Sequence, residues 1–414
     1  VILYLHLYKI KRMKRSLILA LLLLLAMVIH AQKRESAIGE IYIDQENIVP
    51  FNMDVSFQSD PPLFTVTNAE ERIVVTDVEK KGDSLIFRMP IFQGTFIIKP
   101  TQDQWKGFYY PKGINESKPY QFVAQLGMSD RFYRFQEPAN YNLTGRWKIT
   151  ENPGTPDETI LIGEFVQQEN RLTGSILNPS GDYRYLDGKV SGNKMMLSAF
   201  DGSHQIVLSA TVSHDSLKNG AFTGSARWKS NWIAIKDSTI ELPKMEQLVW
   251  LKQNAKAPSF SFPNTSNQQI SLNDPKFSGK VIILQIMGTW CPNCLDEARL
   301  FNELISQKEF SNVIVLGLCF EGASFESSVP KMIRFANQTN LNYPLLYAGK
   351  AGSKERNNLL FMVEGSMAFP TVLYLDKNGN PRYVTTGFSG PGTGQHYLET
   401  KKEIISKLRH LLAE

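Results

Sequence analysis

Two cysteines that stand two residues apart are the side chains of this chain best suited to chemistry. Cys291 and Cys294 follow an apolar run, residues 281–287, that predicts a buried strand, and apolar residues recur after them at helical spacing. We therefore expect Cys291 at an exposed helix start, with Pro292 in the first turn, where its missing N–H is not needed. Backbone N–H groups and the positive end of the helix dipole would favour the Cys291 thiolate, which is the reactive form.

The setting of the cysteine pair favours redox chemistry over metal binding. A structural zinc site needs four ligands, but the only other cysteine is Cys319 and no histidine lies near the pair in sequence. Cys319 falls in an apolar strand and is expected to be inert and buried. A C-x-x-C motif among alternating strands and helices indicates a thiol–disulfide pair. The sequence predicts a redox-active Cys291–Cys294 disulfide, no metal and no other cofactor; a chance pair of buried cysteines is the alternative.

The residues around the pair carry a resemblance to a known family. Residues 290–294, directly after a strand, resemble the thioredoxin superfamily, and in particular the TlpA/ResA-type envelope thiol–disulfide oxidoreductases. Residues 288–291, Glu297 and the later stretch 368–371 also match that pattern, and the resemblance covers about residues 255–414. Asn293 departs from the pattern, because the family usually has proline just before the second cysteine.

The resemblance implies a role for each matching residue. Cys291 would attack and Cys294 would resolve the mixed disulfide. Glu297, on the same helix face as Cys294, would accept its proton; on spacing alone it is equally an acid that favours the helix dipole. Gln285 stands where thioredoxins carry a buried acid. The remaining expected site residues contact the substrate: Trp290, Pro292, Asn293, Phe369 and Pro370. A merely packed Trp290 is the alternative.

The resemblance also implies partners. These are protein thiol or disulfide clients and a membrane electron donor that keeps the pair reduced.

The start of the chain predicts export. The chain begins at Val1, and five basic residues precede an apolar run over residues 17–29, followed by Ala31. A basic flank, a short apolar core and a small residue are typical of a signal peptide, here residues 1–31 with Met13 as a plausible true start. An uncleaved anchor is the alternative, although the run is short for a membrane span. The expected location is the periplasm or cell envelope.

Removal of such a segment would change the charge balance. The whole chain has 45 Lys and Arg against 40 Asp and Glu, a net charge of +5. The five basic residues of the leader account for the excess, so the mature chain is near neutral. We therefore expect no nucleic-acid partner.

The region before the redox motif is expected to be rich in β-strands. Residues 32–140 alternate as antiparallel strands do, and the acids Asp54, Asp60, Glu70 and Glu71 are expected on the solvated surface. Residues 141–240 predict about eight short strands joined by tight turns, which is typical of an antiparallel barrel or sandwich. Such a barrel can hold one small ligand, or its interior can be filled by side chains.

The complete prediction is a multidomain chain. A β-rich N-terminal region is followed by a linker, 241–256, and an α/β thioredoxin-like domain, 257–414, in which a mixed sheet is covered by helices. The predicted activity is reduction of protein disulfides. An envelope oxidase or isomerase, a thiol peroxidase and a ligand-binding protein remain as alternatives. The pattern of proline, threonine and arginine around the cysteine of a thiol peroxidase is absent, since Gly288 and Leu284 precede Cys291 by three and seven residues.

Overall fold

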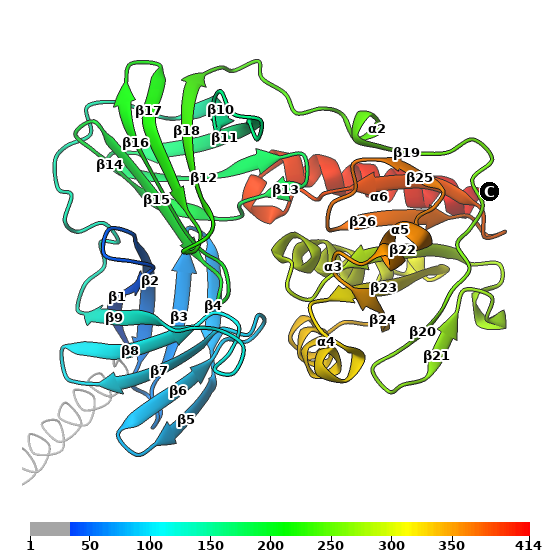
Figure 1. Cartoon of the computed structure of the whole chain (residues 1–414), viewed down its shortest axis with the longest axis horizontal. Coiled ribbons are helices and arrows are strands. Elements are labelled where there is room, and N and C mark those ends of the chain that lie inside the picture. The colour runs from blue at the N-terminus through cyan, green and yellow to red at the C-terminus, as the bar shows by residue number, and fades with distance from the viewer. Residues whose placement is uncertain (1–33) are drawn as a thin grey trace, which may run out of the picture.

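The chain divides into two β-rich units and one α/β unit. The computed structural model describes residues 34–414, so the expected signal peptide over 1–31, with its start at Met13, lies outside the described residues. Figure 1 shows the β-rich units on one side and the α/β unit on the other. Within residues 34–414, no helix combines the length and the apolar character needed to cross a membrane.

The first β-rich unit is a nine-stranded antiparallel sheet that curls around an apolar core. Phe64 packs edge-on against Phe87 and Phe96 from the other half of the sheet, in the strand order β4-β3-β2-β1-β9-β8-β7-β6-β5. The strands are β1 (Arg34–Tyr42), β2 (Ile48–Ser56), β3 (Leu63–Asn68), β4 (Glu71–Val75), β5 (Asp77–Lys81), β6 (Ser84–Arg88), β7 (Thr95–Pro100), β8 (Gln104–Tyr110) and β9 (Tyr120–Leu126). The predicted antiparallel sheet is confirmed.

The second β-rich unit is a closed antiparallel barrel. Its strands are β10 (Gly145–Glu151), β11 (Thr159–Gln168), β12 (Arg171–Asn178), β13 (Gly181–Asp182), β14 (Leu186–Ser191), β15 (Lys194–Phe200), β16 (Gln205–Ser213), β17 (Ser216–Thr223) and β18 (Lys229–Lys236). Strand β10 pairs with β11 and β18, and β11 also pairs with β12, which closes the ring. Apolar side chains, among them Trp147, Phe165 and Leu172, fill the interior. The structure therefore agrees with an interior filled by side chains rather than one that holds a small ligand.

Strand β17 of the barrel contains an irregularity in its pairing. The dipeptide Asn219–Gly220 is of a type that favours hairpin turns, but it lies inside β17, where the register against β18 shifts between Leu217 and Gly220. Asn219 has a φ of 51°, which suits a bulge as well as a turn. The hairpin turn lies earlier, at His214, which also has a positive φ.

A buried arginine, Arg131, forms hydrogen bonds to both β-rich units. Arg131 donates to the carbonyl oxygens of Thr67 (2.6 Å) and Ser198 (2.8 Å), which belong to the first unit and the barrel respectively. The side chain of Asn68 donates to the Phe200 carbonyl (2.8 Å). Buried polar groups with partners on both sides hold such an interface in one arrangement.

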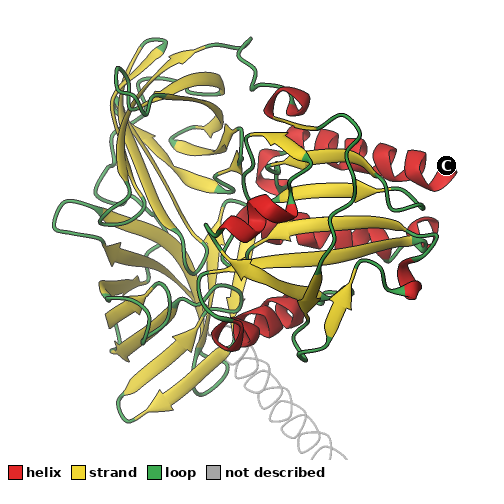
Figure 2. Ribbon diagram, turned by 45° about the vertical axis from the view of Figure 1, so that its right-hand side comes forward, coloured by secondary structure: helices red, strands yellow, loops and turns green. Residues whose placement is uncertain are grey.

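The α/β unit is built on a five-stranded mixed sheet in the order β24-β23-β22-β26-β27. Its strands are β20 (Ser261–Pro263), β21 (Gln269–Ser271), β22 (Val281–Met287), β23 (Val313–Glu321), β24 (Leu345–Lys350), β25 (Val363–Gly365), β26 (Thr371–Leu375) and β27 (Pro381–Thr386). Its helices are α3 (Pro292–Ile305), α4 (Phe325–Thr339), α5 (Lys354–Leu359) and α6 (Gln395–Ala413), with 3-10 turns η1 (Pro275–Phe277), η2 (Lys308–Phe310) and η3 (Pro391–Thr393). Figure 2 shows that the two β-rich units are built of strands, whereas the α/β unit combines strands with helices. The predicted thioredoxin-like α/β architecture is confirmed.

The faces of the central sheet are covered by different elements. Alternate residues of β22 point to opposite faces. Ile283 therefore joins a cluster with residues of α3, α4 and α6, whereas Leu284 joins one with residues of α5, β19 (Val249–Leu251), β20 and β21. Helix α4 begins after Ser324 and carries Pro330 inside it.

The segment expected to be a linker is partly folded onto the α/β unit. Within 241–256 the chain forms α2 (Met245–Leu248) and β19 (Val249–Leu251), and β19 pairs antiparallel with β25. Val249 is buried in the core of the α/β unit. Residues 245–251 of the expected linker therefore pack as part of the α/β unit, held by one buried side chain and a strand pairing that the polar composition does not reveal.

Candidate redox site

The cysteine pair lies where the central strand β22 passes into helix α3. Cys291 is the N-cap of α3, and its Sγ accepts a hydrogen bond from the Cys294 N–H (3.2 Å). Pro292 is the first residue of the helix, as its lack of an N–H permits. The expected helix start is therefore confirmed, and the sulfur lies where free N–H groups and the helix dipole stabilise negative charge.

The Cys291 sulfur is recessed, which corrects the expectation of an exposed cysteine. Cys291 is only 4% exposed and Cys294 is fully buried, and both are free thiols. The Phe369 carbonyl oxygen lies 3.6 Å from Cys291 Sγ, and the Trp290 ring packs edge-on against the Phe369 ring at 5.2 Å. Phe369 comes from a loop 78 residues away, so local sequence could not show that it lies against the sulfur.

A buried acid fixes the turn that presents Cys291. Glu321, at the end of β23, accepts from the Thr289 N–H and the Thr289 hydroxyl, both at 2.8 Å. The Trp290 indole N–H donates to the Phe320 carbonyl (3.0 Å). A Cβ atom at Gly288 would lie 2.3 Å from the Trp290 ring nitrogen, so only glycine fits beside this indole. The turn is therefore held from the neighbouring strand.

Glu297 lies in a buried hydrogen-bond network behind Cys294. Its side chain is 2% exposed, and its Oε2 accepts from Gln285 Nε2 (2.9 Å). The same amide group lies 3.5 Å from the Cys294 carbonyl oxygen, and Gln285 Oε1 accepts from the Tyr343 hydroxyl (2.8 Å). Burial raises the pKa of Glu297 to about 8, because desolvation disfavours the carboxylate. A carboxyl with such a pKa can gain and lose a proton near neutral pH.

The second cysteine cannot ionise easily by itself. Burial, the hydrogen bond with Cys291 and the charge of Cys291 all raise the pKa of Cys294 well above its usual value. A thiol attacks only as thiolate, so Cys294 needs a nearby group to take its proton. Glu297 is the acid that this network places behind it.

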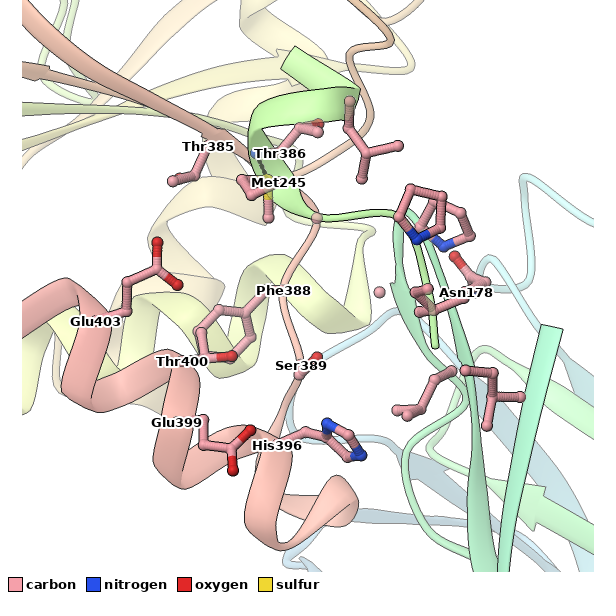
Figure 3. Close-up of a pocket in the computed structure, with 18 of the residues that line it drawn as sticks. Asn178, Met245, Thr385, Thr386, Phe388, Ser389, His396, Glu399, Thr400 and Glu403 are labelled. Carbon is pink, nitrogen blue, oxygen red and sulfur yellow. Dashed lines mark hydrogen bonds between the residues drawn. The ribbon is translucent and has the colours of Figure 1, made fainter. Parts of the chain in front are cut away.

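A cavity borders Glu297 on the side of α6. The cavity has a volume of about 640 Å³, and Glu297 is among the residues that line it. Figure 3 shows its α6 wall, where His396, Glu399 and Glu403 lie opposite Thr385 of β27 and Met245 of α2. A polar cavity of this size can hold water. The Glu297 side chain therefore borders a cavity on the side of α6 that can hold water.

The barrel contacts the two residues that separate the cysteines. Asn293 donates to the Asp182 carbonyl (3.3 Å) and accepts from the Asp182 N–H (3.1 Å), with its amide oriented to satisfy both bonds. A Cβ at Gly181 would lie 1.6 Å from the Asn293 amide, so this approach requires glycine. Gly390 donates its N–H to the Asp182 carboxylate (2.7 Å). Asn293, the departure from the family pattern, is thus the residue that meets β13.

A buried ion cluster joins all three units beside the cysteine pair. Arg184, which follows β13, pairs with Asp296 of α3 (2.5 Å) and with Glu71 of the first β-rich unit, and also donates to the Pro292 carbonyl (3.3 Å). The side chains of all three charged residues are nearly inaccessible, which suits a paired arrangement. The expectation that Glu71 is a solvated surface acid is wrong, because Arg184 covers it.

The remaining expected site residues lie around the pair, and their roles stay predictions. Pro370 follows Phe369 through a cis peptide bond. Trp290 is 41% exposed. Among residues 34–414, no cluster of three or more His, Cys, Asp or Glu side chains is arranged to hold a metal ion.

Sequence reasoning missed the groups that hold the site from a distance. Tyr343 and Arg184 carry no motif that could have identified them, since their partners are 58 and 112 residues away. The sequence marks Gln285 only as the replacement of a buried acid, whereas its amide lies against both the Glu297 carboxyl and the Cys294 carbonyl oxygen. Its polar side chain inside an apolar strand was the one available signal, because a buried polar group needs partners.

Comparisons with known proteins agree with this geometry. Residues 252–399 match the family model described as Redoxin. The Thioredoxin-like protein YneN of Bacillus subtilis (strain 168) is 28% identical over 160 residues, covering 39% of this chain and 81% of the relative. The Thiol-disulfide oxidoreductase ResA of Geobacillus thermodenitrificans (strain NG80-2) is 26% identical over 148 residues, 35% of this chain and 76% of the relative. The Thiol:disulfide interchange protein DsbE of Escherichia coli (strain K12) is 25% identical over 152 residues, 36% and 74% respectively.

Proposed function

We propose that this chain, a thiol–disulfide oxidoreductase of the ResA and DsbE family by its C-terminal domain, works as a reductase of protein disulfides in the cell envelope. The predicted family and enzyme class are confirmed. The observation that supports the direction is the buried Glu297 carboxyl, which accepts a hydrogen bond from the same Gln285 amide that lies against the Cys294 carbonyl oxygen. A base that prepares Cys294 for attack speeds the release of a reduced client, as a reductase requires.

The reaction proceeds through two exchanges of sulfur partners. The Cys291 thiolate attacks one sulfur of the client disulfide, and the other client sulfur leaves as a thiolate. Cys294 then passes its proton to Glu297 and attacks Cys291 Sγ. The mixed disulfide breaks, the client leaves with its second thiolate, and a Cys291–Cys294 disulfide forms. Two electrons have moved from the cysteine pair to the client, and the client thiolates take up protons from solvent.

The proposed partners follow from the same chemistry. The oxidised pair must recover two electrons before another turnover, and a membrane electron donor is the source that the family resemblance implies. The names ResA and DsbE denote a thiol–disulfide oxidoreductase and a thiol:disulfide interchange protein. Protein disulfides as clients and a periplasmic or envelope location are therefore parts of this proposal.

The reduction potential tests the direction. Equilibration of the Cys291–Cys294 pair with glutathione redox buffers should give a value nearer to about −270 mV, typical of a thioredoxin, than to about −120 mV, typical of a strong envelope oxidant. A value close to −120 mV would make the chain an oxidase or isomerase instead.

Trapping of clients tests the partner class. A Cys294→Ser variant cannot resolve the mixed disulfide, so it should retain client proteins through Cys291. The matched Cys291→Ser variant should retain none. Equal retention by both variants would contradict the assignment of the attacking cysteine.

A further inference from the structure

A second cavity lies between the redox motif and the two β-rich units. It has a volume of about 420 Å³. Trp290, Pro292 and Asn293 of the redox motif line one side, and residues of the barrel and of the first β-rich unit line the rest, among them Tyr183, Phe200, Ile206 and Trp228. The cavity is thus continuous with the surface that a client disulfide must approach.

Two tryptophans leave apolar surface uncovered at this cavity. Trp228 is 47% exposed and Trp290 is 41% exposed. Trp228 packs edge-on against Phe222 at 4.7 Å, and Trp290 is anchored by its bond to the Phe320 carbonyl, so neither ring is a loose surface side chain. Ordered aromatic rings with open faces, one from the barrel and one from the redox motif, are typical of a binding site.

The charged residues that line the cavity are already paired within the protein. Arg184 is held by Glu71 and Asp296. Asp182 accepts from the backbone N–H groups of Arg184 (2.5 Å) and Gly390 (2.7 Å). Asp201 accepts from the backbone and the ring of His204, at 2.8 Å and 2.9 Å. A ligand therefore gains little from ionic contacts here, and its affinity must come from burial of apolar surface.

We propose that this cavity receives a bulky apolar or aromatic side chain that neighbours the reactive cysteine in an extended client segment. The proposal rests on the function proposed above and adds the substrate class. A volume of about 420 Å³ is at the scale of a small ligand rather than a folded domain. Cys291 is recessed, so the client disulfide must reach it on a segment thin enough to enter between the barrel and the redox motif. The barrel thereby selects unfolded or extended clients.

Peptide kinetics with a matched tryptophan control test this substrate class. Two peptides with the same intramolecular disulfide are compared, one with phenylalanine and one with glycine beside a cysteine. The protein should show a higher kcat/KM for the phenylalanine peptide, and Trp228→Ala should lower the ratio of the two kcat/KM values by about tenfold or more. Trp228→Phe should restore most of that ratio. Trp250→Ala should leave it unchanged, since Trp250 is 45% exposed but lies on β19 and does not line the cavity.

The outcomes separate the substrate class from the proposed direction of the reaction. An unchanged ratio in Trp228→Ala with a native circular dichroism spectrum, or no preference in the unaltered protein, would overturn the proposal. A loss confined to glutathione disulfide turnover would assign the cavity to small disulfides and also overturn it. If the reductase assignment fails, the reduction potential of the cysteine pair will lie close to that of a strong envelope oxidant. The preference for the phenylalanine peptide can then be measured with the reduced peptides, as the rate at which their dithiols are oxidised.

Discussion

Replacement of Glu297 by glutamine should expose the proton transfer that releases the client. A mixed disulfide between Cys291 and a small aromatic thiol resolves only when Cys294 loses its proton, and Glu297 is the acceptor in the proposed mechanism. The pKa of Glu297 is about 8. About one tenth of the molecules therefore carry the carboxylate at pH 7 and about nine tenths at pH 9, so the resolving rate should rise about ninefold or tenfold between these values and then level off.

Stopped-flow reaction with 5,5′-dithiobis(2-nitrobenzoate) measures this step. Attack by Cys291 releases the first coloured thiolate, and resolution by Cys294 releases the second. In Glu297→Gln the second phase should slow by about 10²–10⁴-fold near pH 8. It should also keep rising at higher pH without a plateau, because only direct ionisation of Cys294 remains, and its pKa is raised by burial.

A neighbouring acid on the same helix provides the control. Glu303 is about half exposed and pairs with Lys401, so Glu303→Gln should change neither phase. The first phase should also be the same in all three proteins. A Glu297→Gln variant with the same second-phase rate, or one whose rate still levels off above about pH 9, would refute the proton-acceptor role and leave Glu297 as an acid that favours the helix dipole.

Three further predictions follow from the burial and contacts of the site. Iodoacetamide should label Cys291 faster than Cys294 in the reduced protein, because Cys291 lies at the helix N-terminus and Cys294 is fully buried; mass spectrometry that finds equal rates would contradict the division of roles. Arg184→Ala leaves Glu71 without its ion pair and leaves Asp296 with only the half-exposed Arg299. It should cost about 3–5 kcal/mol of interface stability, seen as faster protease cleavage between the barrel and α2. Arg409→Ala, which removes an exposed pair, should behave like the unaltered protein. A fragment of residues 241–414 retains α2 and β19 and should fold and reduce insulin; an insoluble or inactive fragment would mean that the β-rich units complete the site.

The sequence by itself determined the features that depend on neighbours along the chain. Cys291 at the start of a helix, Pro292 in its first turn and the buried strand before them follow from local spacing. Period-two alternation and turn residues likewise indicated antiparallel strands over the β-rich region. The redox pair and the thioredoxin-like fold could therefore be predicted, because both depend on short stretches whose spacing and residue types allow few other structures.

Only the tertiary structure decided how the rest of the chain surrounds the pair. Phe369 lies against the Cys291 sulfur and helps to bury it. Asn293 is bonded to Asp182 of the barrel, and Arg184 covers the Glu71 carboxylate. Each of these contacts joins residues from different elements, and nothing in the spacing of one partner specifies the other. The physical reason is that burial and ion pairing are properties of the packed units, whereas helix starts and strand alternation are properties of the local backbone.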